Sequence, residues 1–459
     1  MKHYHLNGLL QNEDWIVPAY ISTDQLGLIT QISNEPQSGI SYERVEGYAL
    51  PGFQNAHSHA FQYAMAGIAE VHKVNQVADD FWSWREAMYK VALTINPDQL
   101  EAIATMLYAE MVRHGYTNVA EFHYLHHDKN GKRYGNLVEM GGRLVAAAQT
   151  AGIKITLVPM FYQVGGFGVP AQDHQRRFIS SSIDDYHKLL DATKVLAKQH
   201  PHANHGFGIH SLRAVKPDDI IRSLSSVEAD LPIHIHISEQ LKEIEDAQSY
   251  LGKRPVQWLL DNASVNSNYH LVHATHLVKN EVTGIAESGA HVVLCPSTEG
   301  NLGDGIFPLK SFQDQGGKWS IGTDSHVGLN PLEELRILDY GQRLTSHHRN
   351  TFTSTTEGNS GAYAIRQSLL AGRAAMNNHE TTYFEKGMPF DAVIYDANSA
   401  LISTSSHSNL LPTIAYSSDS THTLGTIVNG RWVVQNNLHL AGVSIADKFK
   451  KALKEIAVR

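Results

Sequence analysis

The amino-acid sequence predicts an α/β fold, a (β/α)8 barrel with a flanking β-sandwich built from both ends of the chain. Three observations predict it. From about residue 50 to residue 375, short apolar runs alternate with helical stretches, as in a parallel sheet. Polar residues that can bind or work a metal ion stand where several of these runs end, and the strands of a barrel all end at one catalytic face. Both ends of the chain instead show short strands joined by turns.

The expected barrel strands follow one another in sequence order. The first lies around Ala49–Leu50 and leads into PGFQNAHSH. The others are TNVAEFH, IKITLVPMFY, GFGIH, LPIHIHIS, YHLVHA, HVVLCPS and KWSIGTD. Most gaps hold a helical pattern, such as RPVQWLLDNA, and one helix has clear boundaries: Asn96-Pro97-Asp98 opens it and Gly115 ends it. Eight strands in order, with helices between them, indicate a TIM-type barrel.

The chain divides into three expected parts, with residues 51–380 forming the barrel. Residues 1–50 and 381–459 are expected to pair into one small β-sandwich beside it. In the C-terminal part, FDAVIYDA, HTLGTIVNGRWVVQNN and LHLAG have the pattern of strands, and Asn429-Gly430 is typical of a hairpin turn. A polar, lysine-rich helix, SIADKFKKALKEIAVR, is expected to follow.

Composition limits the function. The 42% hydrophobic and 18% charged fractions of this 459-residue chain are typical of a soluble enzyme. A net charge of -9 argues against a nucleic-acid partner, because there is no basic stripe to neutralise phosphates. The single cysteine, Cys295, excludes a disulfide framework and fits a reducing cytosol. No segment approaches a membrane span, so we expect a cytoplasmic protein that acts on a small molecule.

A metal site is predicted at the strand ends. His57 and His59 follow the first strand, and residues i and i+2 of an extended segment face the same side, so both imidazoles can reach one ion. Strand five offers His234 and His236 on one face. His236 lies nearer the catalytic end and has Glu239 three residues on, so we expect His236 to be the ligand and His234 to be a hydrogen-bonded interior residue.

Two further residues complete the predicted centre. Asp324 ends strand eight; its alternative role is a helix N-cap, but the next helix is expected to start near Asn330-Pro331. His273 ends strand six and could be a fifth ligand or a catalytic group; three histidines and one aspartate already satisfy zinc, so we assign it to catalysis. No lysine ends strand four to bridge two metals, so one ion is expected. Zinc with an open position indicates chemistry on a bound water.

These residues carry a family resemblance. PGFQNAHSHA, HISE, LVHATH and IGTDS resemble the amidohydrolase superfamily, specifically its mononuclear zinc deaminase branch. HAFQYAMAG, DDFWSWREAMY, EFHYLHH, GIHSLRAV and CPSTEGNLGDGIFP resemble, within that branch, the enzymes that deiminate N-formimino-L-glutamate. The likeness covers essentially the whole chain. It implies a composite β-sandwich, one Zn²⁺ per chain, a homodimer, and hydrolysis of N-formimino-L-glutamate to N-formyl-L-glutamate and ammonia in histidine breakdown.

The resemblance also implies a role for each matching residue. The zinc ligands would be His57, His59, His236 and Asp324; the catalytic groups would be Glu239, His273 and again Asp324; and the substrate contacts would be Gln62, Arg85, Tyr124, His210 and Arg213.

The implied chemistry fits these residue types. The substrate would carry two carboxylates and a cationic formamidine, and the guanidinium groups of Arg85 and Arg213 suit carboxylates. Surface salt bridges are the alternative role for both arginines, and loop packing is the alternative for Gln62 and Tyr124. Two other functions stay open: a deaminase of the same superfamily acting on another amidine, a guanidine compound or a nucleobase, and a catalytically silent zinc-binding barrel. The segment 301–305 resembles a phosphate loop only superficially and receives no role.

Overall fold

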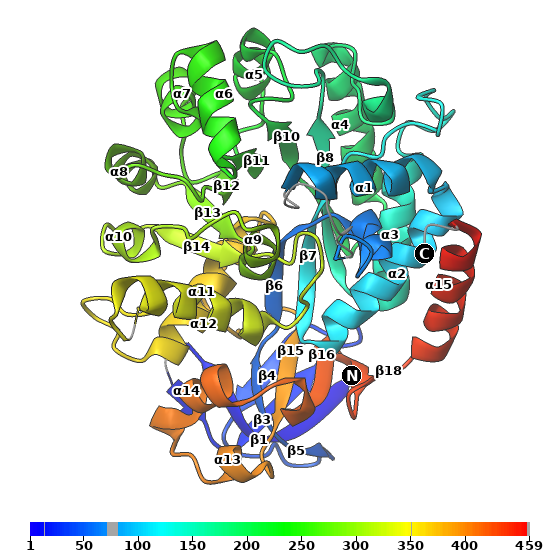
Figure 1. Cartoon of the computed structure of the whole chain (residues 1–459). Helices are drawn as coiled ribbons and strands as arrows, with labels where there is room; N and C mark the ends of the chain where they lie inside the picture. The colour runs from blue at the N-terminus through cyan, green and yellow to red at the C-terminus, as the bar shows by residue number, and fades with distance from the viewer. Residues whose placement is uncertain (13, 71–80, 350, 457–459) are drawn as a thin grey trace.

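The computed structural model describes residues 1–12, 14–70, 81–349 and 351–456, and these residues form two sheets (Figure 1). One sheet is a barrel of parallel strands taken in sequence order, and a bridge between Ser58 and Asp324 brings its first and last strands together. Its strands are β6 (Phe53–Ser58), β7 (Tyr116–His123), β8 (Lys154–Phe161), β10 (Phe207–Ser211), β11 (Ile233–Ile237), β12 (Tyr269–His273), β13 (His291–Leu294) and β14 (Lys318–Ile321), with β9 (Ala203–His205) beside β8. The predicted (β/α)8 barrel is confirmed.

The expected position of the first barrel strand is wrong. Ala49 and Leu50 lie in β5 (Glu43–Pro51), which belongs to the other sheet and pairs antiparallel with β15 (Ala392–Asp396). The barrel begins at β6, after Gly52. A Cβ on Gly52 would stand 2.1 Å from a side-chain carbon of Thr117, so only glycine lets the chain pass this close to β7. The apolar run at the end of β5 has the pattern expected of a first barrel strand, whereas β6 is fully buried although most of its residues (FQNAHS) are polar.

The second sheet joins the two ends of the chain, as predicted. Its strand order is β18-β17-β16-β15-β5-β1-β3-β4, so β5 from the N-terminal segment lies between β1 and β15. The remaining strands are β1 (Lys2–Gln11), β2 (Asp14–Ile16), β3 (Ala19–Thr23), β4 (Ile29–Ser33), β16 (Thr423–Val428), β17 (Arg431–Gln435) and β18 (Leu438–His439). The hairpin turn at Asn429-Gly430 is confirmed, with φ of 47° and 65°, which suits a two-residue turn with both central residues left-handed.

Helices surround the barrel and lie between its strands in sequence. They are α1 (Phe81–Thr94), α2 (Pro97–Arg113), α3 (Glu139–Ala151), α4 (Ile183–Lys198), α5 (Pro217–Leu224), α6 (Leu241–Leu251), α7 (Pro255–Asn262), α8 (Lys279–Ser288), α9 (Pro296–Leu302), α10 (Leu309–Gln313), α11 (Pro331–Ser346) and α12 (Ser360–Ala374). Two predicted helix starts are confirmed: Asn96 caps α2 in a capping box with Gln99, and Asn330 caps α11. Short 3₁₀ turns are η1 (Ala60–Met65), η2 (Asp173–Gln175) and η3 (Ser420–His422).

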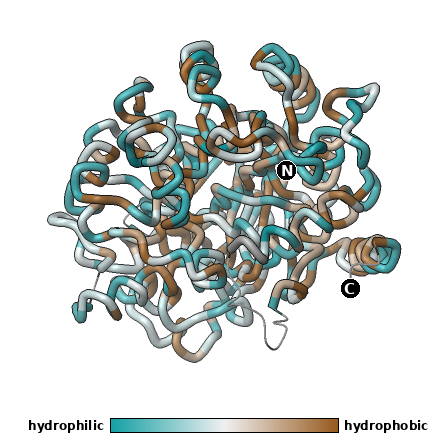
Figure 2. The backbone as a smooth tube through the Cα atoms, turned by 45° about the horizontal axis from the view of Figure 1, so that its top comes forward, coloured by the Kyte–Doolittle hydropathy of each residue, from teal (hydrophilic) through white to brown (hydrophobic). Residues whose placement is uncertain are grey.

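The C-terminal region adds α13 (Ala400–Ser403), α14 (His407–Ser417) and α15 (Gly442–Ile456). The terminal helix α15 lies alongside α2 (Figure 1) and is more amphipathic than its lysines suggest. It buries Ile445, Ala452 and Ile456, and Phe449 stacks on Tyr63 of η1 at 5.6 Å. Hydrophilic and hydrophobic stretches alternate along the outer helices (Figure 2). Among the described helices, none is long and apolar enough to cross a membrane.

Candidate metal centre and active site

Four predicted ligands converge where the barrel strands end. Between the imidazoles, Nε2 of His236 lies 3.1 Å from Nε2 of His57 and 3.3 Å from Nε2 of His59. The carboxylate oxygen Oδ1 of Asp324 lies 3.3 Å from the same atom of His57 and 3.5 Å from that of His59. A tetrahedral zinc ion with nitrogen ligands at 2.0–2.1 Å separates neighbouring donors by roughly 3.4 Å. The spacing of the four donors therefore fits a zinc-sized ion.

The hydrogen bonds of the rings support the same conclusion. Nδ1 of His59 donates to the carbonyl of Phe122 at 2.9 Å, and Nδ1 of His236 donates to the carbonyl of His210 at 2.7 Å. With the proton on Nδ1, the Nε2 lone pair of each ring faces the centre. Burial also lowers the pKa of His57, to about 3, and lowers that of the other two rings, so protonation does not relieve the crowding of lone pairs. A cation does.

His273 lies where three carboxylates meet. Its Nε2 is 3.6 Å from Oε1 of Glu239 and 3.7 Å from Oδ2 of Asp324, and its Nδ1 is 3.2 Å from Oε1 of Glu299. Burial acts to lower the pKa of His273, but Glu239 and the other carboxylates outweigh it and raise the pKa to about 10. These contacts place His273 and Glu239 beside the four donors, where they can exchange protons with a reacting molecule.

The predicted substrate contacts line one cavity with these groups. Its lining includes Gln62, Arg85, Tyr124, His210 and Arg213 together with His59, His236, Glu239, His273 and Asp324. The surface salt-bridge alternative does not hold for Arg213, because its side chain is only 10% exposed and lies 3.2 Å from Glu243 and 3.7 Å from Glu239. Arg85, on α1, donates to the hydroxyl of Tyr162 at 3.1 Å, and Gln62 donates to the hydroxyl of Tyr124 at 2.9 Å. The substrate roles of these residues stay predictions.

The strand ends that carry the site have unusual backbone geometry. His273, Ala274 and Asp324 have positive φ values of 68°, 49° and 45°, and Ser238, after β11, has 54°. Residues other than glycine rarely adopt this left-handed region, which costs about 1–3 kcal/mol for each residue. The left-handed turns point His273 and Asp324 back toward the centre as their strands end.

Sequence reasoning missed several groups at the site. Glu299, in the first turn of α9, accepts from the backbone N–H of Cys295 at 2.9 Å as well as contacting His273. Asp304 groups with Glu239 and His273, and its Oδ2 is buried without a hydrogen-bond partner among the described residues. Burial and Glu239 raise the pKa of Asp304 to about 9. Both residues belong to the segment CPSTEGNLGDGIFP. This segment contributed to the family resemblance, but its acidic residues were given no role.

The structural expectation for one neighbouring residue is confirmed. His234 donates from Nε2 to the carbonyl of Ala375 at 2.9 Å and is fully buried, as expected for an interior histidine below His236. Cys295 is also fully buried, and burial raises the pKa of its thiol well above the usual value. Neither side chain is therefore placed to act on a substrate.

Comparison with known proteins gives relatives across the whole length. Residues 48–433 match the Amidohydrolase family. Formimidoylglutamate deiminase of Pseudomonas aeruginosa is 43% identical over 417 residues, which cover 90% of each chain. A 5-methylthioadenosine/S-adenosylhomocysteine deaminase of Haloquadratum walsbyi is 24% identical over 390 residues, 84% of this chain and 79% of that protein.

Two solved structures are similar in fold. A crystal structure of an amidohydrolase from Brucella melitensis has a TM-score of 0.92 at 40% identity and covers 99% of this chain and 100% of its own. An adenosine deaminase from Xanthomonas campestris, with bound zinc, has a TM-score of 0.80 at 18% identity, over 100% of this chain and 98% of its own. The second likeness concerns the fold alone.

Proposed function

Since the chain belongs to the amidohydrolase family, we propose that it hydrolyses N-formimino-L-glutamate to N-formyl-L-glutamate and ammonia, a step of histidine catabolism. It is a hydrolase that acts on a C–N bond of a linear amidine. The assignment of this substrate rests on the cavity, which is lined by two arginines, Arg85 and Arg213, together with metal donors. A dianionic substrate needs two such cations, whereas an uncharged nucleobase does not.

One Zn²⁺ per chain would be held by His57, His59, His236 and Asp324, which have the spacing and the free lone pairs that the ion needs. When bound, zinc makes water acidic enough to supply a nucleophile at neutral pH and polarises the bond under attack. We also expect a homodimer and a cytoplasmic location.

The residues of the chain then divide the proton transfers. Asp324 accepts a proton from the attacking water as its oxygen bonds to the formimino carbon, and the protonated ring of His273, 3.7 Å from Asp324, orients that water. Glu239 then takes the proton of the new hydroxyl group and passes it to the terminal nitrogen, whose bond to that carbon breaks to release ammonia. The carbon keeps the oxygen as the carbonyl of the formyl group. Arg213 lies 3.7 Å from Glu239 and so holds its carboxylate facing His273.

Substrate position follows from the other residues that line the cavity. Arg85 and Arg213 would hold the two carboxylates, with Gln62, Tyr124 and His210 adding hydrogen bonds. Burial and the charge of Arg213 lower the pKa of His210 well below its usual value, so this ring acts as a neutral hydrogen-bonding group. The formimino end then points toward Glu239 and the metal donors.

Ammonia release from N-formimino-L-glutamate tests the proposal. The zinc-replete protein and chelator-treated protein are assayed side by side, with N-formyl-L-glutamate identified by mass spectrometry. Zinc-dependent ammonia with this co-product supports the reaction. Ammonia released only from adenosine, guanine or a guanidine compound would show that the enzyme has a different substrate. No ammonia from any of these compounds, in a folded and zinc-loaded sample, would favour the alternative of a catalytically silent zinc-binding barrel.

A further inference from the structure

A buried carboxylate without a role in the proposed mechanism contacts two residues that line the active-site cavity. Glu243 lies in the first turn of α6, and its side chain is fully buried. Its Oε1 accepts from the backbone N–H of Ser238 at 3.1 Å. Its Oε2 accepts from the backbone N–H of Glu239 at 3.1 Å and from Nη1 of Arg213 at 3.2 Å. Glu243 is therefore bonded both to the residue that transfers protons and to a residue expected to hold a substrate carboxylate.

The two backbone hydrogen bonds hold the turn that presents Glu239. This turn follows β11, which carries His236, and within it Ser238 has a left-handed φ of 54°. Residues other than glycine stay in this region only where surrounding contacts hold them there. The carboxylate of Glu243 accepts from the N–H of Ser238 and from the N–H that follows it. It thereby fixes the direction in which the side chain of Glu239 leaves the backbone.

The third hydrogen bond of Glu243 holds the guanidinium group of Arg213. Nη2 of Arg213 lies 3.7 Å from Oε2 of Glu239, so this group stands between two carboxylates, of which Glu243 is the nearer. Because Glu243 offsets the charge of Arg213, the guanidinium is not drawn fully onto Glu239, whose Oε1 lies 3.6 Å from Nε2 of His273. A guanidinium group has five N–H donors, so Arg213 can keep Glu243 and still bind a substrate carboxylate.

The contacts of Glu243 require its ionised form. Burial raises the pKa of this carboxyl group, while Arg213 and the two backbone N–H groups act to lower it. Donors face both of its oxygens, as suits an ionised carboxylate, which only accepts. Glutamine has nearly the same size but one acceptor oxygen, so it would set its amide N–H₂ group against one of these donors. The substitution therefore removes the contacts while keeping the volume.

We propose that Glu243 is a positioning residue for the deamination, which holds Glu239 for proton transfer and Arg213 for recognition of a substrate carboxylate. The role rests on the proposed function, since it acts through what those two residues do. One buried carboxylate joins the two tasks, so a single substitution at this position should change both KM and kcat.

Glu243→Gln tests the proposal through kcat and KM for ammonia release from N-formimino-L-glutamate by the zinc-loaded protein. KM should rise about tenfold, because Arg213 loses a charge-assisted hydrogen bond that orients it. The kcat should fall about tenfold to a hundredfold, because displacement of Glu239 by a fraction of its own length misplaces the proton transfer. Glu243→Asp keeps the charge and should show a smaller rise in KM. Zinc per chain and the midpoint of thermal unfolding are measured for each variant.

A double-mutant cycle separates positioning from general damage to the fold. In Arg213→Met the connection from Glu243 to the substrate carboxylate is already broken, so adding Glu243→Gln should raise KM no further. The kcat should still fall on that addition, because the backbone hydrogen bond to Glu239 is independent of Arg213. Damage to the fold alone would instead multiply the two effects on KM.

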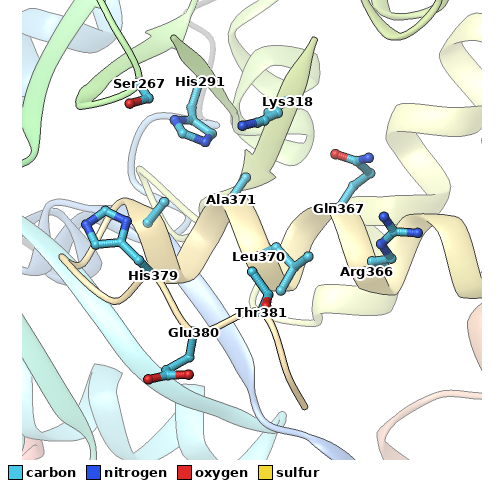
Figure 3. Close-up of a pocket in the computed structure, with 11 residues that line it drawn as sticks. Ser267, His291, Lys318, Arg366, Gln367, Leu370, Ala371, His379, Glu380 and Thr381 are labelled. Carbon is cyan, nitrogen blue, oxygen red and sulfur yellow. The ribbon is translucent and has the colours of Figure 1, made fainter. Parts of the chain in front are cut away.

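Two controls exchange a carboxylate for an amide elsewhere. Glu245→Gln changes an exposed residue of α6. Glu380→Gln changes an exposed residue that lines a cavity of about 420 Å³ (Figure 3). That cavity is also lined by His291 and Lys318, the first residues of β13 and β14, so it lies at the end of the barrel opposite the active site. Both controls should leave kcat and KM unchanged.

The proposal is overturned if Glu243→Gln has the kcat and KM of the wild type, or if its effect on KM multiplies with that of Arg213→Met. It is also overturned if Glu243→Gln and Glu243→Asp both lose zinc or fail to fold, which would show a structural role. A folded, zinc-loaded wild type without activity would refute the proposed function and this proposal with it. An active wild type beside an unchanged Glu243→Gln would refute the role of Glu243 alone.

Discussion

Replacing Glu239 by glutamine should separate proton transfer from metal binding. The side chain keeps its size, and Glu239 is not among the four donors whose spacing fits zinc. Arg213 loses a partner at 3.7 Å but keeps Glu243 at 3.2 Å, so no buried arginine is left without a carboxylate. We therefore expect Glu239→Gln to fold and to bind zinc as the wild type does. Its loss should fall on kcat, by about 10²–10⁴-fold, the usual contribution of a general acid or base.

Three measurements examine this expectation: zinc per chain by elemental analysis, the midpoint of thermal unfolding, and kcat and KM for ammonia release. Glu245→Gln is the matched control, because Glu245 is an exposed residue on α6 close to Glu239 in sequence. A kcat within a few-fold of wild type would refute the proton-transfer role of Glu239. Loss of zinc together with activity would show instead that Glu239 supports the metal centre.

Three other predictions concern the substrate wall, the metal and stability. Arg85→Met should raise KM for N-formimino-L-glutamate by about tenfold to a hundredfold, with a smaller change in kcat. The control Arg222→Met, which alters an exposed pair with Asp219, should change neither constant. Equal effects of the two variants would refute the contact between Arg85 and a substrate carboxylate. Chelation should abolish activity, and one equivalent of zinc should restore it. In His236→Asn the same amount of zinc should not restore activity, which a zinc titration monitored by the rate of ammonia release would show. Burial raises the pKa of Glu334 from 4.5 to about 8, so the stability that this group contributes is complete below pH 4.5 and is lost as pH rises through about 8. Glu334→Gln should remove that loss, and its unfolding midpoint relative to wild type should therefore be higher at pH 8.5 than at pH 6; a difference that does not change with pH would contradict the burial argument.

The sequence predicted the residues whose position follows from strand ends. His57, His59 and His236 each stand at the end of an apolar run, and parallel strands bring such ends to one face without any knowledge of packing. Asp324 could be assigned for the same reason, since the helix it might have capped starts at Asn330. Assigning these residues to one site required only the order of the strands.

Other features depend on tertiary packing, which periodicity does not contain. The break between β5 and β6 is set by the close approach of Gly52 to Thr117, and β6 is buried although most of its residues are polar. Glu299 and Asp304 reach His273 and Glu239 from α9 and the loop after it, whose path depends on how that helix packs. The polar pattern of the terminal helix likewise concealed the stacking of Phe449 on Tyr63.

The left-handed backbone at His273 and Asp324 has a consequence for protein engineering. Glycine suits such φ values better than histidine or aspartate, but His273 pairs with three buried carboxylates and Asp324 contacts two buried imidazoles, so removing either side chain costs more stability than the relief of strain returns. Ser238, with φ of 54° and no assigned role in the reaction, is the position where the same relief is open without that loss. A directed-evolution screen that scores both heat tolerance and activity should therefore accept glycine at 238 and reject it at 273 and 324.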